Sequence, residues 1–511
     1  MDISTSHSRH DKIGEVFTPV KWAQWLITRW GIFDAWRDGA SVCDPTAGQG
    51  AFILALFKMA QEQGFPLTTE NLSRLSLIEI NPHNLHAFSH EALTAYGVRF
   101  PEENMLAQDV ILQPSSRQYD ILVGNPPWVN FADLPEHYKN RLAPLFVTSG
   151  LVPDRRKILL GASRVDLAAL VLKHALGKLL RPNGRGYFFL PTSLFFGDDA
   201  HRGFRDYAAE GYPFAIKEVY EFTQTKVFES VGTSYCAAWI QMGEKATFPI
   251  PYIRETKTGT IASVASPLHK SDDPWRVYSP HDNPAPTHLN LTLPAYQKPR
   301  QGVNTCGANE VFIFHTKPSH LPEQYLYPLA TKEIWCDPAS PPAKWILLPY
   351  DPETGRPLSL AQFKRHPSLI AHLEKHRDGL ERRKGVLIRS AIEKGFWWSL
   401  LGVGRYSFAP YKIMWEAYGQ KEFRPIILHP HADQQWQANQ SMHAFIPAWS
   451  RDDAIRIHEG LLSPDIPTLL KQMNGEGKCN WAQPGKVIKL LDLGETTYQQ
   501  SSLFERMEAL V

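Results

Sequence analysis

Hydrophobic positions alternate between a helical period and short unbroken runs over the first half of the chain. The helical period predicts helices over residues 22–30 and 51–61. Short apolar runs at 40–43, 75–80 and 119–123 predict buried strands, because each is too short for a core helix and has turn residues beside it. Such alternation is typical of a mostly parallel sheet flanked by helices.

The same alternation continues beyond these elements. Residues 166–180 predict a helix that Pro182, Asn183 and Gly184 stop, and residues 186–190 predict the strand after that turn. We therefore expect an α/β domain with a Rossmann-like, mostly parallel sheet.

The pattern changes near residue 245. From there to about residue 300, Pro, Ser, Thr and His dominate, which is typical of a linker or long loops. Beyond it come short strands, a basic helical stretch and many aromatic residues. A length of 511 residues also suggests more than one domain. We expect a first domain over residues 1–245 and a mixed α+β domain over residues 246–511.

Composition narrows the class of protein only a little. The net charge of +2 excludes a polybasic chain but leaves room for one basic DNA-binding cleft. Residues 1–12 are polar and no apolar run reaches 18 residues, so we expect neither a signal peptide nor a membrane span. The cysteines are far apart and form no CxxC pair, which favours a reducing cytoplasm over a zinc ribbon or disulfide framework: Cys43, Cys236, Cys306, Cys336 and Cys479.

A glycine-rich turn follows the first predicted strand. Residues 44–50 read Asp-Pro-Thr-Ala-Gly-Gln-Gly and lead into a helix whose first N–H groups and positive dipole end are free for a ligand. A dinucleotide fingerprint would need a third glycine at position 53, where this chain has Ile53. The turn therefore predicts a cofactor site other than that for NAD, with four candidate contacts: Asp44, Ala47, Gly48 and Gly50.

Two acidic residues fall where an adenosine would need acceptors. Glu79 ends the second predicted strand, at roughly the distance that nucleotide-binding folds use for a ribose-binding acid. Asp109 follows a third element and could accept from an adenine amino group. Each could instead be a loop carboxylate or a helix cap, and the case for binding depends on the neighbouring motifs.

The strongest candidate for chemistry is Asn125-Pro126-Pro127-Trp128, directly after the strand that ends at residue 123. Two prolines make a stiff turn without N–H donors, which holds the Asn125 side chain and a neighbouring carbonyl in fixed positions. Both oxygens can accept from one NH2 group, and Trp128 offers a flat face to a base that has left the duplex stack. The alternative is a rigid turn without chemistry.

In this order, the motifs resemble those of the gamma-class amino DNA methyltransferases. Residues 14–19 (Gly-Glu-Val-Phe-Thr-Pro) resemble the family's first motif, which implies that Thr18 and Pro19 lie beside the cofactor. Residues 78–82 resemble the ribose motif and add Ile80, and residues 107–109 resemble the adenine-binding motif. Asp166-Leu167 is similar to the fifth motif, and Val227-Phe228 to a later one whose aromatic ring packs on the flipped base.

The second half carries looser resemblances to the target-recognition region of restriction-system methyltransferases, over residues 300–312, 326–329, 345–351 and 411–415. The basic stretch 364–389 is a candidate for phosphate contacts or a solvated helix face. Candidate DNA contacts are Arg300, Arg382, Arg383, Lys384 and Arg424.

The resemblance implies an enzyme that moves a methyl group from S-adenosylmethionine to N6 of a flipped adenine in double-stranded DNA. Asn125 and the Pro126 carbonyl would hold the amino group, Pro127 would stiffen the turn, and Trp128 and Phe228 would sandwich the base. No metal is implied. Only about a dozen residues precede Gly14, so we expect the nuclease to be a separate subunit, if there is one. The alternatives are methylation of RNA or protein glutamine, and a complex-dependent or inactive DNA-recognition subunit.

Overall fold

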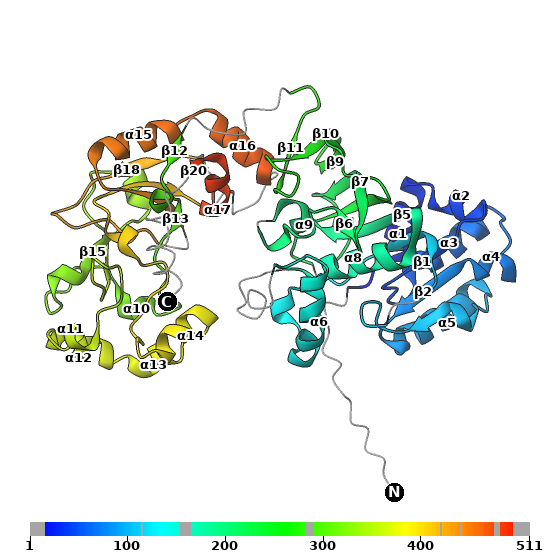
Figure 1. Ribbon diagram of the computed structural model, residues 1–511, viewed down its shortest axis with the longest axis horizontal. Coiled ribbons are helices and arrows are strands. Elements are labelled where there is room, and N and C mark those ends of the chain that lie inside the picture. The colour runs from blue at the N-terminus through cyan, green and yellow to red at the C-terminus, as the bar shows by residue number, and fades with distance from the viewer. Residues whose placement is uncertain are drawn as a thin grey trace, which may run out of the picture. The chain divides into compact units, whose positions relative to one another are not determined.

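The computed structural model describes residues 16–113, 116–153, 165–197, 199–229, 231–282, 291–418, 422–439, 442–474 and 481–493. These residues form two compact units, divided between Asp282 and Asn283 (Figure 1). None of the helices in these ranges has the length and apolar content to cross a membrane.

The first unit is built on one twisted sheet, which has eleven strands among the described residues. Its order is β11-β10-β9-β7-β8-β5-β4-β1-β2-β3, with β6 paired to β7. The strands are β1 (Val42–Asp44), β2 (Leu75–Glu79), β3 (Met105–Ala107), β4 (Tyr119–Gly124), β5 (Leu180–Pro191), β6 (Ala208–Ala209), β7 (Tyr212–Phe222), β8 (Tyr235–Met242), β9 (Ile250–Thr256), β10 (Gly259–Pro267) and β11 (Trp275–Tyr278).

The strands from β3 to β5 are parallel, as the alternation of helices and strands predicts. Beyond β5 the sheet continues with antiparallel pairs, except that β9 runs parallel to β7. All residues of β1 and β2 are buried, because helices cover both faces of this part of the sheet.

The helices of the first unit are amphipathic or almost wholly apolar, as their places against the sheet require. In α8, ten of the thirteen residues are buried. The helices are α1 (Val20–Arg29), α2 (Ile32–Arg37), α3 (Ala51–Glu62), α4 (Thr69–Ser73), α5 (Pro82–Tyr96), α6 (Glu136–Thr148), α8 (Leu167–Leu179) and α9 (Ser193–Phe196), with short 3-10 turns at Glu102–Asn104, Phe131–Asp133 and Asp199–His201.

Two boundaries differ from those that the sequence predicts. The first unit extends to Asp282 rather than to residue 245, because β9 pairs with β7 and adds β10 and β11 to the same sheet. Strand β5 begins at Leu180 rather than at residue 186. It pairs with β4 on both sides of an irregularity that contains Asn183, whose φ is +65°. The turn residues therefore bulge within the strand instead of preceding it.

The second unit is mixed α+β. It has a four-stranded antiparallel sheet (β13-β19-β17-β18), a three-stranded sheet (β14-β16-β15) and the pair β12-β20. The strands are β12 (Thr292–Leu293), β13 (Arg300–Gln301), β14 (Ile313–Phe314), β15 (Leu326–Leu329), β16 (Lys344–Leu347), β17 (Tyr411–Glu416), β18 (Ile426–Leu428), β19 (His443–Ala448) and β20 (Asp492–Leu493).

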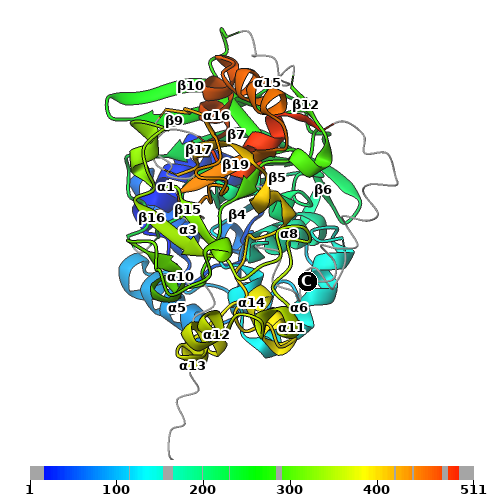
Figure 2. The ribbon, with the colours of Figure 1, turned by 90° about the vertical axis from the view of Figure 1, so that its left-hand side faces the viewer.

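The helices of the second unit gather at its two ends. In both views, α11–α14 lie at the end away from α15 and α16 (Figures 1 and 2). The helices are α10 (Asn309–Phe312), α11 (Leu360–Phe363), α12 (Pro367–Glu374), α13 (Arg377–Glu381), α14 (Val386–Glu393), α15 (Arg451–Leu461), α16 (Asp465–Asn474) and α17 (Pro484–Val487), with 3-10 turns at Glu323–Tyr325, Lys332–Trp335, Arg405–Phe408 and Ile488–Leu490, and at residues 295–297.

Candidate functional site

The carboxyl ends of β1 and β4 meet where the order of the sheet reverses. The chain passes from β1 to β2 and β3 on one side, and β4 and β5 lie on the other. In open α/β sheets, ligands bind in the crevice beside such a point. The glycine-rich turn follows β1, and Asn125 follows β4, so both predicted motifs lie at this edge of the sheet.

The glycine-rich turn needs glycine at its two alternating positions. Gly48 has φ +52° and Gly50 has φ +75°, both in the left-handed region that side chains disfavour. A Cβ on Gly50 would lie 2.2 Å from Cδ2 of Phe88, and one on Gly48 would lie 3.2 Å from Cδ1 of Phe17. The turn is therefore tight, and Ala51 begins α3 directly after it.

A cavity of about 460 Å³ opens at this turn. Its volume is in the range of small-molecule and cofactor sites. Five predicted site residues line it: Thr18, Asp44, Ala47, Gly48 and Asn125. The other lining residues are Val16, Phe17, Val20, Thr46, Gln49, Ala51, Phe52, Leu54, Ala87, His90 and Glu91. Gly14 and Glu15 of the first motif lie outside the described residues.

One hydrogen bond orients the side-chain amide of Asn125 and leaves its oxygen without a partner. Its Nδ2 donates to the backbone oxygen of Val16 at 3.2 Å, which fixes the orientation of the amide. Its Oδ1 is buried and has no hydrogen-bond partner in the structure, and neither has Oγ1 of Thr46 in the same cavity. A buried acceptor without a partner costs free energy, so both atoms suit a ligand that donates hydrogen bonds.

Asp44 presents a buried carboxylate to the same cavity. Burial raises the pKa of this carboxyl well above its usual value, and the hydrogen bond from the backbone N–H of Thr46 to Oδ1 (3.1 Å) opposes the shift. The negative charge of Glu79 raises this pKa further. A Cβ on Gly124 would lie 3.0 Å from Oδ1, so the glycine leaves room for the carboxylate. A cationic ligand group would favour the ionised form.

Glu79 lies at the end of β2 and joins the turn to α5. Its Oε2 accepts from the N–H of Gly48 at 2.7 Å, and its Oε1 accepts from the N–H of Asn81 at 2.9 Å. Nδ2 of Asn84 donates to the same Oε1 at 3.4 Å. Glu79, Pro19, Gly50 and the half-exposed Ile80 are not among the residues that line the cavity. A ribose would have to share or replace these bonds to reach Glu79.

Asp109 has partners inside the protein for both oxygens. Oδ1 accepts from the N–H groups of Ile111 (2.9 Å) and Leu112 (3.1 Å), and Oδ2 accepts from the hydroxyl of Tyr138 at 2.9 Å. Burial, and then the charge of Asp109, raise the pKa of Tyr138. Asp109 does not line the cavity, and its contacts are those of a loop carboxylate.

The rings of Trp128 and Phe228 touch each other directly. Their centroids are 5.1 Å apart and their planes are at 85°, and Phe228 is buried against Phe189 and Tyr235. A base between two rings needs them parallel and separated, so this arrangement differs from the predicted sandwich. Phe228 supports one edge of Trp128, whose Nε1 is buried and has no hydrogen-bond partner in the structure.

The predicted DNA contacts separate into buried and accessible groups. Arg383 is buried, and it donates to the backbone oxygens of Leu380, Thr305, Ser399 and Trp397. Its prediction as a DNA contact is therefore corrected: the guanidinium ties together loops of the second unit. Arg300 is half-buried and stacks on Tyr406 at 4.3 Å, whereas three candidates are exposed: Arg382, Lys384 and Arg424.

Thr46 and Val16 lie within the two predicted cofactor motifs but are not among the candidate contacts, and the α5 residues Ala87, His90 and Glu91 lie outside every predicted motif. The spacing of the α5 residues, three and four positions apart, is that of one helix face beyond the ribose motif. Val16 contributes through its backbone oxygen, for which side-chain patterns give no signal.

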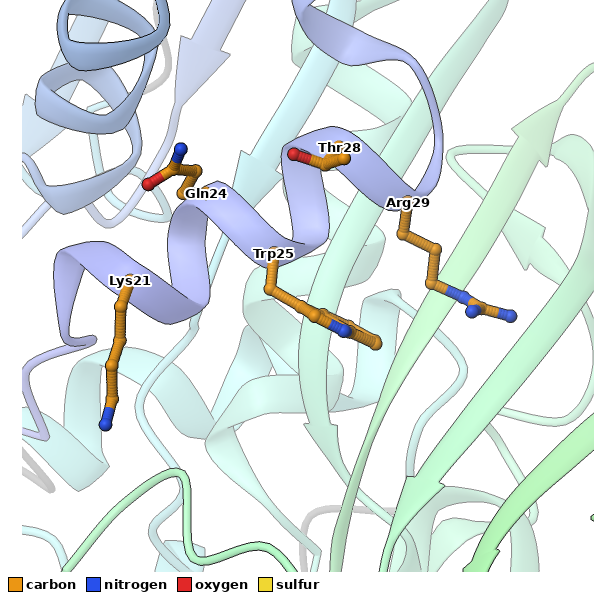
Figure 3. Close-up of a pocket in the computed structure, with 5 residues that line it drawn as sticks. All are labelled: Lys21, Gln24, Trp25, Thr28 and Arg29. Carbon is orange, nitrogen blue, oxygen red and sulfur yellow. The ribbon is translucent and has the colours of Figure 1, made fainter. Parts of the chain in front are cut away.

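A second hollow lies along α1. Figure 3 shows Lys21, Trp25 and Arg29 in one row on the helix, with Gln24 and Thr28 beside them. Arg29 is already paired with Glu218 at 2.6 Å and stacks on Tyr220. This hollow therefore belongs to the packing of α1 on β7 and not to the site at the carboxyl edge.

No protein-family model matches the chain, and no curated protein matches it either. Among solved structures, it is similar to the type IIL restriction-modification enzyme MmeI in complex with DNA, with 12% identity and a TM-score of 0.51 over 84% of this chain and 60% of that one. The type IIG restriction endonuclease BpuSI (12%, TM-score 0.40, 97% and 61%) and the EcoKI M protein of a type I restriction enzyme (12%, 0.34, 47% and 48%) are also similar. The chain spans about 60% of the length of MmeI.

At such low identity, the likeness to MmeI establishes the fold alone. Together with the order of the sheet, it confirms the predicted fold class. The first unit has a Rossmann-like α/β fold with helices on both faces of its sheet, and a mixed α+β unit follows it.

Proposed function

We propose that this chain is a site-specific DNA adenine-N6 methyltransferase that uses S-adenosylmethionine, and that it is the modification component of a restriction-modification or related defence system. The observation that carries the proposal is the buried Oδ1 of Asn125, which has no hydrogen-bond partner and lines the cavity. An exocyclic NH2 group is a donor that this atom can accept from. The bond from Nδ2 to Val16 keeps the oxygen, not the nitrogen, available.

The residues around the cavity fit the cofactor. Thr18, Asp44, Ala47 and Gly48, which line the cavity, would hold it. The motif order supports Glu79 for the ribose hydroxyls and Ile80 and Asp109 for the adenosine, although these three residues lie outside the lining and Glu79 would have to share its present hydrogen bonds. Asp44 would balance the positive charge of its methionine end, and the unpartnered hydroxyl of Thr46 would bond its polar groups. The cofactor supplies an electrophilic sulfonium methyl, so the protein mainly has to orient the acceptor.

The chain's own residues then orient and polarise the amino group. Oδ1 of Asn125 and the carbonyl of Pro126 would accept its two hydrogens and so direct the nitrogen lone pair toward the methyl group. Trp128 would carry the face of the flipped base, with Phe228 behind it. The nitrogen becomes acidic after attack, and its proton can then leave to water, so no strong general base is needed.

The second unit would bind the DNA duplex. The exposed cations Arg382, Lys384 and Arg424 would contact phosphates, and Arg300 would contribute through its stack on Tyr406. Support comes from the sequence resemblance to target-recognition regions. The similar enzyme MmeI was solved in complex with DNA.

The proposal is tested by expressing the chain in a host without DNA methylation and sequencing the genomic DNA by a method that detects modified bases directly. We expect N6-methyladenine at one recurring sequence. The variant Asn125→Ala should abolish the mark and leave cofactor binding intact. Asn140→Ala, an exposed position on α6, is the matched control and should keep the mark.

Two results would contradict the proposal. An unchanged mark with Asn125→Ala would remove this side chain from the reaction. A host genome without modified bases, when the purified chain binds the cofactor, would favour a protein or RNA substrate or an obligatory partner subunit. Those alternatives are then separated by methyl-transfer assays with each substrate.

A further inference from the structure

The segment that carries Trp128 is fastened to the start of α8. Residues 129–131 and 165–167 lie antiparallel, with Asn130 bridged to Asp166. The N–H of Phe131 donates to the oxygen of Val165 at 2.9 Å, and the N–H of Leu167 donates to the oxygen of Val129 at 2.8 Å. These bonds join two segments that are more than thirty residues apart in the sequence.

The side chain of Asp166 adds a further link at the same place. Its Oδ1 accepts from the N–H of Ala168 at 2.8 Å, which caps the first turn of α8. The backbone N–H of Val129, the residue directly after Trp128, faces the same carboxylate. Asp166 is 8% exposed, so its bond to Ala168 is shielded from water. One buried carboxylate thus holds the first turn of α8, to which backbone bonds fasten the loop after Trp128.

We propose that Asp166 is a positioning residue of the methyl-transfer site, whose ionised carboxylate fixes the first turn of α8 and, through the backbone bonds between residues 165–167 and 129–131, the ring of Trp128. The inference rests on the proposed function, and it assigns control of the methyl-transfer rate to a carboxyl group outside the cavity. Asp166 touches neither the cavity nor Asn125, and it acts only through the backbone of the loop.

This position makes the link sensitive to pH. Burial raises the pKa of Asp166 to about 7, against the hydrogen bond from Ala168 and the nearby backbone N–H of Val129, which lower it. The backbone N–H groups that face this carboxyl belong to Ala168 of α8 and to Val129 in the loop after β4. No charged side chain of the described residues contributes to the shift. The carboxylate is the better acceptor, so the link weakens as pH falls through this value.

The test compares single-turnover methyl transfer by the full chain over roughly pH 6 to 9 with genomic DNA from a methylation-free host. The wild-type rate should rise through about pH 7. Asp166→Asn keeps a helix-capping oxygen but does not titrate. It should lower the plateau rate by about ten- to a hundred-fold and remove this limb of the profile, because the loop is less firmly placed. Cofactor binding should not change.

The matched control is Thr68→Ala, which removes a side-chain cap from α4 without a contact to the loop. Its pH profile should equal that of the wild type. The inference is overturned if Asp166→Asn retains the wild-type rate and pH profile, or if Thr68→Ala changes them in the same way.

Hydrogen exchange of the peptide 125–131 gives a second readout that does not need activity. At roughly pH 8, Asp166→Asn should expose to exchange the N–H of Phe131, which bonds to the oxygen of Val165, whereas Thr68→Ala should not. Equal protection in all three proteins refutes the link. Lost protection in Asp166→Asn, together with a wild type that methylates no DNA, refutes the proposed function but supports the contact. The two failures are therefore distinguishable.

Discussion

Single residues decide whether the glycine-rich turn of the proposed cofactor site can form. We predict that Gly50→Ala weakens cofactor binding at least about ten-fold and lowers the free energy of unfolding by about 2 kcal/mol, because a Cβ there meets Phe88 and the backbone has a positive φ. Isothermal titration with S-adenosylmethionine and urea unfolding measure the two effects.

Gly97→Ala is the matched control for this substitution. Gly97 has a similar φ of +69° at the end of α5, but a Cβ there would have nothing within 4 Å. It should show the backbone strain without the steric clash or the effect on the cofactor. Equal losses in both variants would mean that the contact with Phe88 is unimportant.

The basic stretch contains neighbours with opposite roles. Arg383→Ala should lower the free energy of unfolding of the second unit by at least about 2 kcal/mol, since it leaves several buried carbonyl oxygens without a donor. Lys384→Ala, at an exposed position, should leave stability within about 0.5 kcal/mol. Urea unfolding of both variants tests this.

Binding to DNA should rank the same two variants in the reverse order. Lys384→Ala should reduce the affinity for DNA and make that affinity less dependent on salt. Without this phosphate contact, fewer counterions are released when the protein binds. A folded Arg383→Ala variant that loses as much of this salt dependence would place Arg383 at the DNA surface and contradict the burial.

For single residues, the sequence predicts which side chains lie at the site better than it predicts which groups they contact. The motifs place Asp44, Gly48 and Asn125 at one cavity, because their order along alternating strands fixes the edge at which they emerge. The sequence could not show that Asp109 is occupied by Tyr138, or that Arg383 is buried, because these depend on distant segments. Arg382 is exposed and its neighbour Arg383 is buried, although both are arginines, so residue type alone does not separate them.

Among the elements, the helix and strand periods predict α1, α3, β1, β2 and β4 within a few residues. The start of β5 and the end of the first unit were less predictable. Turn residues can lie in a bulge inside a strand, and a stretch rich in Pro and Ser can still pair at the edge of a sheet.

Strand β17 contains a buried cation that should make the second unit sensitive to pH. Lys412 is 1% exposed, and its Nζ donates to the backbone oxygens of Ser407 and Ala409. Burial lowers the pKa of Lys412 to about 7, below its value in the unfolded chain. Between these two values the unfolded state binds a proton that the folded state does not, so stability rises with pH.

We therefore predict that the free energy of unfolding of the second unit increases from about pH 7 to pH 9 more in the wild type than in Lys412→Met. The slope due to this group should be at most about 1.4 kcal/mol per pH unit. Urea unfolding at both pH values measures the difference between the two proteins. A parallel pH dependence in both would show that Lys412 is charged in the folded state.

For the whole molecule, the two units keep separate cores. The first is organised around the long sheet and the second around two smaller sheets and their helices. The cavity that we assign to the cofactor is lined only by residues of the first unit. A ligand bound there stabilises the folded state of that unit directly.

Calorimetry of the full chain should therefore show two unfolding transitions, of which S-adenosylmethionine raises only one. At a ligand concentration of about 100 times Kd, the expected stabilisation is about 2.7 kcal/mol. Asn125→Ala should keep this shift, because its amide would hold the base. Gly50→Ala should reduce it to about 1.4 kcal/mol or less, because its turn would hold the cofactor. Equal shifts of both transitions would show that the units unfold together, and loss of the shift in Asn125→Ala would move that side chain from the base to the cofactor.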